Sequence, residues 1–209
     1  MRRLPSELTE TLRLSIIAAP MFSVSGPDLV ITSCKAGIIG AFSLADCRTL
    51  NDLDLWLTQI VAETDRTAPF AANLIVHRSN NWLQEDAELV AEHRTPLVIA
   101  SVGNPAPIID KIHAYGGKVF ADIASLRHAE KAITAGVDGL ILLTAGAGRQ
   151  TGWADPFAFV DGPIVMAGGI GDATAFEAAL VLGADLAYMG TRFFATQESM
   201  AVAGYKDML

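Results

Sequence analysis

Two segments near the C-terminus, IVMAGGI at residues 164–170 and LAYMGTRF at residues 186–193, indicate the fold. Each is a short apolar run that ends in small residues, and a helical pattern follows it. Two such strand ends side by side would direct backbone N–H groups toward one point, and a helix start would add the positive end of its dipole. In a barrel of alternating strands and helices, phosphate usually binds at the loops after the last two strands. The pair therefore predicts a barrel with a phosphate-bearing ligand.

The rest of the chain shows the same alternation of apolar runs and amphipathic segments. The first six predicted strands cover residues 16–21, 38–42, 70–76, 97–101, 118–123 and 139–144. The seventh and eighth lie within the two segments at residues 164–170 and 186–193. The predicted helices cover residues 25–36, 50–64, 81–93, 105–115, 125–135, 156–160, 172–182 and 196–209. Strict alternation of strands and helices is typical of a parallel sheet. We therefore expect an α/β fold, a compact (β/α)8 TIM barrel that forms a single domain over residues 1–209.

Composition restricts the partners and the location of the protein. The net charge is −8 and no cluster of Lys or Arg occurs, so we expect neither nucleic acid nor an anionic membrane surface as a partner. Hydrophobic residues make up 51% of the chain, yet no apolar run approaches the length of a membrane span. Glu7 and Glu10 stand where a signal peptide would be apolar. We expect a cytoplasmic protein in which Cys34 and Cys47 are reduced thiols.

Four motifs resemble those of the FMN-dependent nitronate monooxygenases, formerly called 2-nitropropane dioxygenases. They are APM at residues 19–21, NLIVH at 73–77, AGGI at 167–170 and MGTRF at 189–193. The resemblance extends from residue 14 to residue 209 and implies a barrel that holds FMN and oxidises alkyl nitronates with molecular oxygen. Family members usually continue well past the eighth strand, so the chain resembles a short form.

Related barrels leave other functions open. They include NADH:quinone reductases and flavin-dependent enoyl-acyl carrier protein reductases. An NAD(P)H-dependent reductase of quinones or enoyl thioesters is therefore an alternative, as is a flavin-binding barrel without turnover. We expect a small substrate, such as a nitronate or a similar anion or carbonyl compound, and a homodimer is among the expected assemblies.

The resemblance also implies which residues hold FMN. The segment at residues 19–21 would line the isoalloxazine ring, and Asn73 would form a hydrogen bond with it. Backbone N–H groups of the last two strand ends and the Thr191 hydroxyl would hold the phosphate. The cofactor-binding candidates are Ala19, Pro20, Met21, Asn73, Asp122, Gly146, Gly148, Ala167, Gly168, Gly169, Met189, Gly190 and Thr191. The glycines after the sixth strand would allow close approach to the cofactor.

The candidate catalytic residues are Gln150 and His77. Nitronate-oxidising relatives have a histidine in a pattern like Gly-Gly-His-x-Gly, and Gln150 stands at about that position here. Glutamine forms hydrogen bonds but does not take up a proton, which argues against general-base chemistry at that position. His77 follows the third strand and could face the barrel mouth, or it could belong to a polar loop.

Other interpretations also stay open. Asp122 replaces a lysine that several relatives have near the end of the fifth strand, and it could face the site or cap the next helix. Arg192 could neutralise a phosphate or pair with an acid at the rim. Trp153 and Phe157 could cover a substrate or pack in the core. We expect no metal site, because no set of His, Asp and Glu has the spacing of metal ligands.

Overall fold

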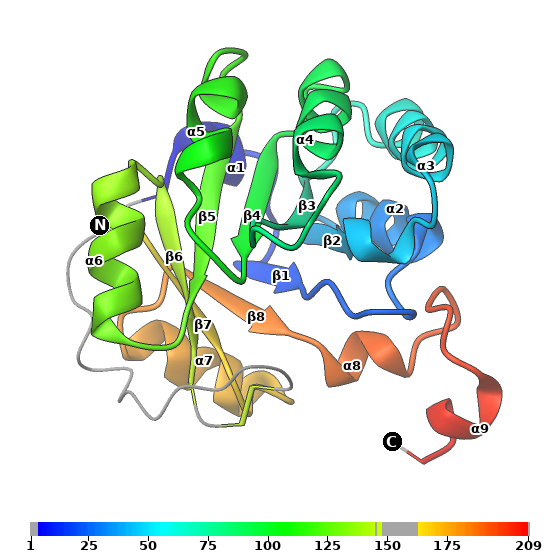
Figure 1. Cartoon of the computed structure of the whole chain (residues 1–209). Helices are drawn as coiled ribbons and strands as arrows, with labels where there is room; N and C mark the ends of the chain where they lie inside the picture. Colours follow the sequence, from blue (N-terminus) through cyan, green and yellow to red (C-terminus); the bar gives the residue numbers. More distant parts are fainter. Residues whose placement is uncertain (1–3, 145, 148–162, 209) are drawn as a thin grey trace.

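A computed structural model describes residues 4–144, 146–147 and 163–208 of the chain. Eight parallel strands form a closed barrel in the order β1 to β8, and Figure 1 shows helices around their outside. The strands are β1 (Ile16–Ala18), β2 (Ile39–Ser43), β3 (Phe70–Ile75), β4 (Leu97–Ser101), β5 (Lys118–Ile123), β6 (Gly139–Leu143), β7 (Ile164–Ala167) and β8 (Leu186–Met189). The predicted (β/α)8 barrel is confirmed.

The helices mostly lie where the amphipathic pattern predicts them. They are α1 (Ser6–Thr9), α2 (Pro27–Lys35), α3 (Leu50–Glu63), α4 (Leu83–Glu92), α5 (Ala106–His113), α6 (Leu126–Ala135), α7 (Ala173–Val181), α8 (Thr191–Phe194) and α9 (Ala203–Lys206), with a 3-10 turn η1 (Leu44–Asp46). Local signals fix several ends. Thr49 and Asp52 form a capping box at the start of α3, and Gly136 ends α6 in the left-handed conformation. The helix predicted at residues 156–160 lies outside the described residues.

The continuous helix predicted at residues 196–209 is wrong. Two short helices, α8 and α9, stand at this end of the chain with an irregular segment between them. The Lys206 ammonium group donates hydrogen bonds to three carbonyl oxygens of that segment, at Thr196, Gln197 and Ser199. The backbone N–H of Met200 donates to the Val24 carbonyl at 2.8 Å. These contacts satisfy backbone groups that a helix would otherwise pair internally, so the irregular path is stable.

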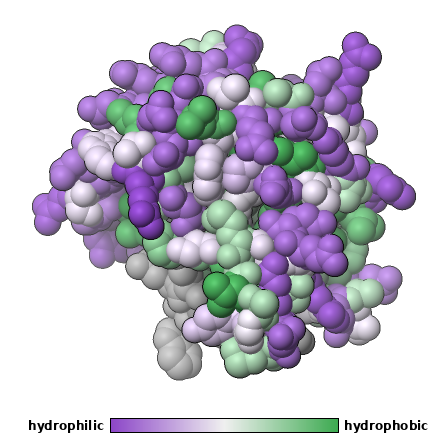
Figure 2. Space-filling view, turned by 90° about the vertical axis from the view of Figure 1, so that its right-hand side faces the viewer, coloured by the Kyte–Doolittle hydropathy of each residue, from purple (hydrophilic) through white to green (hydrophobic). Residues whose placement is uncertain are grey.

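Apolar side chains from alternate strand positions fill the barrel. The inner cluster contains Leu4, Leu8, Ile17, Ile39, Ala41, Ala71, Leu97, Ile99, Phe120, Ile141, Val165, Ala167 and Leu186. A second large cluster packs strands β2 to β5 against helices α2 to α5 on the outside. Figure 2 shows one face of the molecule, where hydrophilic residues predominate and hydrophobic ones form small groups between them. The high apolar content is therefore used mainly to build two concentric layers of core.

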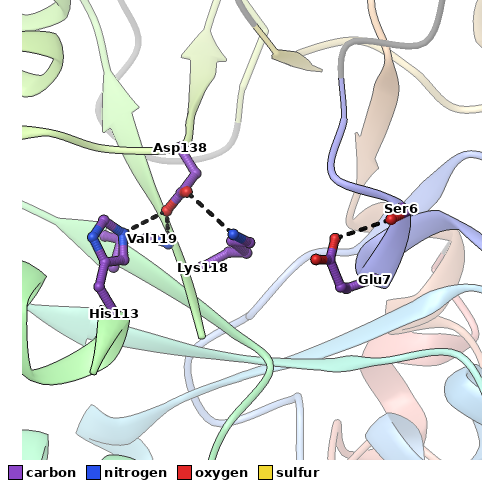
Figure 3. A network of polar contacts seen from close by, with 6 residues as sticks. All are labelled: Ser6, Glu7, His113, Lys118, Val119 and Asp138. Atoms are coloured by element: carbon purple, nitrogen blue, oxygen red, sulfur yellow. Dashed lines mark hydrogen bonds and ion pairs between the residues drawn. The ribbon is translucent and has the colours of Figure 1, made fainter. Parts of the chain in front are cut away.

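The N-terminal end of the barrel is occupied by structural contacts. Leu8 of α1 packs into the inner cluster, next to the start of β5. Figure 3 shows Asp138, which precedes β6, accepting hydrogen bonds of 2.8 Å from the Val119 N–H and from the His113 ring. Lys118 lies 3.7 Å from the same carboxylate. Side chains fill this end of the barrel and polar contacts connect its elements. We therefore expect a ligand site at the opposite end.

Within the described part of the chain, no helix is long and apolar enough to cross a membrane.

Cys34 and Cys47 are both buried and form no disulfide, as the sequence predicted.

Candidate active site

Four polar side chains lie at neighbouring strand ends on the C-terminal side of the barrel. Ser43, Asn73 and Ser101 are at most 2% exposed, and Asp122 is half-buried. Each stands two residues after an inward-facing apolar residue of its own strand, so each side chain points into the barrel. Ser43 and Asn73 are also register partners on β2 and β3. The strands therefore build a polar layer directly above the apolar core; we call these four residues the mouth layer.

Three residues of the mouth layer form a hydrogen-bonded chain. Asn73 Nδ2 donates to the Ile99 carbonyl at 3.1 Å and to Ser101 Oγ at 2.5 Å. Ser101 Oγ in turn donates a short hydrogen bond to Asp122 Oδ2. A carbonyl oxygen only accepts, so the amide atom that faces Ile99 must be the nitrogen. The chain therefore has one direction, from the Asn73 amide through the Ser101 hydroxyl to the Asp122 carboxylate.

The other end of the Asn73 amide has no such contact. Asn73 Oδ1 is fully buried and has no hydrogen-bond partner among the described residues, and the same holds for Ser43 Oγ. Burial of an unpaired polar atom costs about 1–3 kcal/mol. Atoms of this kind at a barrel mouth are candidates for contact with a ligand.

The segment after β1 is held in a fixed conformation by a buried serine. Ser25 Oγ accepts a hydrogen bond of 3.0 Å from the Met21 N–H and donates one of 3.1 Å to the Ala19 carbonyl. The Ala19 N–H continues the barrel ladder by donating to the Met189 carbonyl at 2.8 Å. The predicted strand at residues 16–21 thus ends at Ala18, and residues 19–21 turn into a rigid loop beside the end of β8.

Glycines stand at the ends of β7 and β8, where the sequence predicts an anion site. Gly168 and Gly169 have φ angles of 125° and 65°, in the region that favours glycine. No hydrogen bond to another described residue engages the N–H groups of Gly168, Gly169, Gly190 or Thr191. Gly190 also lies against the loop after β1, since a Cβ there would be 3.4 Å from Met21 Sδ. The two glycine turns and residues 19–21 therefore border one region of the mouth.

The loop after β6 closes on the same region. Gly146 has a φ of 95°, and a Cβ at this position would lie 3.3 Å from the Gly169 nitrogen. Thr144 ties the β6 end to the β7 end, because its hydroxyl donates to the Ala167 carbonyl at 2.7 Å. Gly146 therefore lies against the backbone of Gly169, and its close approach to a cofactor stays a prediction. Gly148 and Gln150 lie outside the described residues, as do Trp153 and Phe157.

The sequence predicts that the helix after β7 directs the positive end of its dipole toward an anion, but an acidic side chain caps this helix. The Asp172 side chain caps α7 by accepting a hydrogen bond of 2.8 Å from the Ala175 N–H. A carboxylate at this position already uses the positive end of the helix dipole, so the amides of the glycine turns are the better donors for an anion. Arg192 Nε donates to the Gly171 carbonyl at 2.5 Å, which joins α8 to the loop before α7.

His77 is exposed on the loop after β3. Its Nδ1 accepts a hydrogen bond of 3.2 Å from the Ser79 N–H and lies 2.7 Å from Ser79 Oγ. A backbone N–H can only donate, so Nδ1 carries no proton in this arrangement and the proton of the neutral ring is on Nε2. His77 can therefore donate a hydrogen bond through Nε2 without first taking up a proton.

The sequence did not single out several residues that organise this site. The motifs do not indicate Ser25, Ser43, Ser101 or Thr144 as residues of the site. Two of them, Ser43 and Ser101, end apolar runs with the parity that points inward, and this signal could have identified them. The contacts of Ser25 and Thr144 depend on loop paths that the sequence pattern does not show.

The fold is a (β/α)8 barrel, and its candidate ligand site lies at the C-terminal ends of the strands. The sequence model of the nitronate monooxygenase family matches residues 78–209, which is more than half of the chain. The chain belongs to the nitronate monooxygenase family.

Curated relatives cover almost the whole chain. A 5-hydroxy-7a-methyl-1-oxo-octahydro-1H-indene-4-carboxyl-CoA dehydrogenase of Rhodococcus jostii is 31% identical over 95% of this chain and 58% of its own length. A nitronate monooxygenase of Paraburkholderia phytofirmans is 28% identical over 93% of this chain and 67% of its own length. The chain thus spans about three fifths to two thirds of these relatives.

Solved structures show the same fold. FabK from Thermotoga maritima is 29% identical, with a TM-score of 0.84 over 97% of this chain and 65% of its own length. The nitroalkane oxidase of Streptomyces ansochromogenes has a TM-score of 0.83 at 23% identity, over 97% of this chain and 72% of its own length. The likeness to the second structure concerns the fold alone.

Proposed function

We propose that the chain binds FMN at the mouth of the barrel and acts as a flavin-dependent oxidoreductase of the nitronate monooxygenase type. The observation that carries the proposal is the buried Asn73 Oδ1, which has no hydrogen-bond partner among the described residues. The same mouth contains four backbone N–H groups that no other described residue engages. An isoalloxazine ring has an imide N–H that can donate to such an oxygen, and a phosphate accepts from such amides. The donor and acceptor sets of the mouth therefore fit the two ends of FMN.

The proposed roles follow the geometry of the mouth. Residues 19–21 would line the ring, because Ser25 holds them rigid beside β8. Gly168, Gly169, Gly190 and the Thr191 hydroxyl would hold the phosphate. Gly146 would pack close to the cofactor. Gly148 is assigned to the same role from the sequence alone. Asp122 would form part of the binding site next to Asn73. Bound FMN would supply the redox chemistry, while these residues bind and orient it.

The substrate that we propose is a preformed nitronate, with molecular oxygen as the oxidant. A nitroalkane must lose a C–H proton before oxidation, whereas a nitronate is already the anion and needs no general base. His77 and Gln150 suit this task, because an Nε2–H and an amide N–H can each donate to a nitronate oxygen. Their proposed role is to orient the anion.

A second candidate is a flavin-dependent dehydrogenase or reductase of a thioester. The relative at 31% identity is named as a dehydrogenase of a carboxyl-CoA compound, which favours this candidate. The sequence alternative of an NAD(P)H-dependent quinone or enoyl-thioester reductase belongs to the same group. Both candidates need the same cofactor site and differ in the second substrate.

The cofactor is tested by a visible spectrum of the purified protein and mass identification of the released group. We expect a yellow protein that releases FMN, and an Asn73→Ala variant that binds FMN more weakly. The protein is then mixed anaerobically with a nitronate, with NADH or with an acyl-CoA. The compound that bleaches the flavin shows which of the two reactions the protein catalyses. A folded, colourless protein that takes up no added FMN would contradict the proposal.

A further inference from the structure

We propose that Ser101 and Asp122 are positioning residues, which fix the Asn73 amide so that its oxygen faces the bound flavin ring. The inference rests on the proposed FMN site and deepens it. It assigns to two residues a role that they perform through a third, without contact to the reacting atoms.

The direction of the hydrogen bonds carries the first step. If the Asn73 amide turned over, its oxygen would face the Ile99 carbonyl at 3.1 Å, where two acceptors would repel each other. Its oxygen would also face Ser101 Oγ, whose proton is already donated to Asp122. The Ile99 carbonyl and Ser101 Oγ therefore both disfavour the reversed orientation of the amide.

The second step is the effect of the carboxylate. The Ser101 hydroxyl donates its proton to Asp122 Oδ2, so the Ser101 lone pairs face the Asn73 amide nitrogen. Without Asp122, the Ser101 hydroxyl could rotate and compete as a donor. Asp122 therefore removes the alternative state of Ser101, and Ser101 removes an alternative state of Asn73. Chains of this kind strengthen each bond in a low dielectric, as here at the buried end of β3.

The consequence is a site with fixed polarity. Asn73 Oδ1 is left as an acceptor with no partner among the described residues, and a ring N–H would complete its bonding. The Asn73 amide is oriented before the ring binds, so no binding free energy is lost in selecting the Asn73 rotamer. The structure thus assigns preorganisation of the flavin-binding amide to Ser101 and Asp122.

The test is a set of double-variant cycles on FMN binding in the full chain. Quenching of flavin fluorescence measures the binding. Ser101→Ala and Asp122→Asn should each weaken FMN binding in the natural background, by about tenfold for Ser101→Ala, which is the loss of one net hydrogen bond. Ser101→Ala should also shift the visible bands of bound FMN. In an Asn73→Ala background, both substitutions should leave the FMN dissociation constant unchanged. Asn73→Val serves as a second background if Asn73→Ala does not fold.

Thr95→Val is the matched control, because Thr95 has a buried hydroxyl with no partner among the described residues and lies just before β4, at the plugged end of the barrel. It should change neither FMN affinity nor the flavin spectrum. Equal losses on Ser101→Ala in the natural and the Asn73→Ala backgrounds would overturn the inference, since they would show a general effect on folding or a direct contact. Equal FMN affinities of the natural protein and the Ser101→Ala variant would also overturn the inference. If the natural protein binds no FMN at all, the proposed function fails instead.

Discussion

The hydroxyl oxygen of Ser25 accepts a hydrogen bond of 3.0 Å from the backbone N–H of Met21. Because Ser25 is fully buried, a Ser25→Ala substitution leaves the Met21 N–H and the Ala19 carbonyl without this partner. We expect the free energy of unfolding to fall by about 1–3 kcal/mol and FMN affinity to fall with it. Urea unfolding and flavin titration measure the two effects.

The control for this prediction is Ser33→Ala. Ser33 is buried on α2, and no side-chain hydrogen bond to another described residue is present for it. This variant should retain FMN affinity. Equal losses of affinity in Ser25→Ala and Ser33→Ala would show that the loop at residues 19–21 does not depend on Ser25.

Gly40 of β2 lies directly against helix α2. A Cβ at this position would be 2.4 Å from the Val30 carbonyl oxygen and 2.8 Å from Val30 Cα, so Gly40→Ala would force the helix away from the barrel. We expect a loss of roughly 1–3 kcal/mol or more in stability, measured by the midpoint of thermal or urea unfolding. Gly204→Ala is the comparison, because a Cβ there would have no described residue outside its own helix within 4 Å. A Gly40→Ala variant as stable as the natural protein would contradict this packing.

Asp86 gives a pH dependence of stability. It is 8% exposed, and burial raises the pKa of its carboxyl, although the hydrogen bond from Asn80 Nδ2 at 3.1 Å opposes that rise. The folded protein therefore holds this proton more tightly than the unfolded chain, whose carboxyl has a pKa near 3.8. Its contribution to stability must fall as pH rises from that value through the higher folded pKa.

The substitution Asp86→Asn removes this ionisation and keeps an oxygen that accepts from Asn80. We expect the variant to gain stability relative to the natural protein as pH rises through the same window, with a constant difference above it. Urea unfolding at a series of pH values measures the change. Asp110→Asn, at an exposed position on α5, should show no comparable gain. A difference that shrinks with rising pH would reverse the predicted sign.

The two cysteines should be chemically silent in the folded protein. Burial raises the pKa of both Cys34 and Cys47 to about 12, so their reactive thiolate forms are scarce at neutral pH. We expect little alkylation by iodoacetamide at pH 8 in buffer and modification of both thiols in concentrated urea, as counted by mass spectrometry. Rapid modification of Cys34 in the native protein would show that α2 opens locally.

The alternation of apolar and amphipathic segments was enough to predict the barrel, because each strand of a parallel barrel is buried on both faces. Strand ends were less predictable. The first strand stops at Ala18 since Ser25, seven residues further on, takes the next backbone groups. The last predicted helix failed for a similar reason, as Lys206 reaches back to carbonyls up to ten residues away. Contacts of this kind follow from tertiary structure and leave no periodic signal.

The candidate site shows the same division. The glycine turns at residues 168–169 and the position of Asn73 could be predicted from motifs. The chain from Asn73 through Ser101 to Asp122 could not, because it depends on the register of three neighbouring strands. Register is set by packing of the whole barrel, and a shift of one residue would turn these side chains outward.

The pairing of β1 with β8 has a consequence for synthesis of the protein. Residue 17 pairs with residue 188, so the ladder of the first strand stays incomplete until the last strand has been made. During translation, β1 must therefore remain outside a closed sheet while more than 160 further residues leave the ribosome. An exposed strand edge of this kind attracts pairing with other chains. The β1 edge therefore stays open for pairing until β8 has been made, and closure of the barrel removes it.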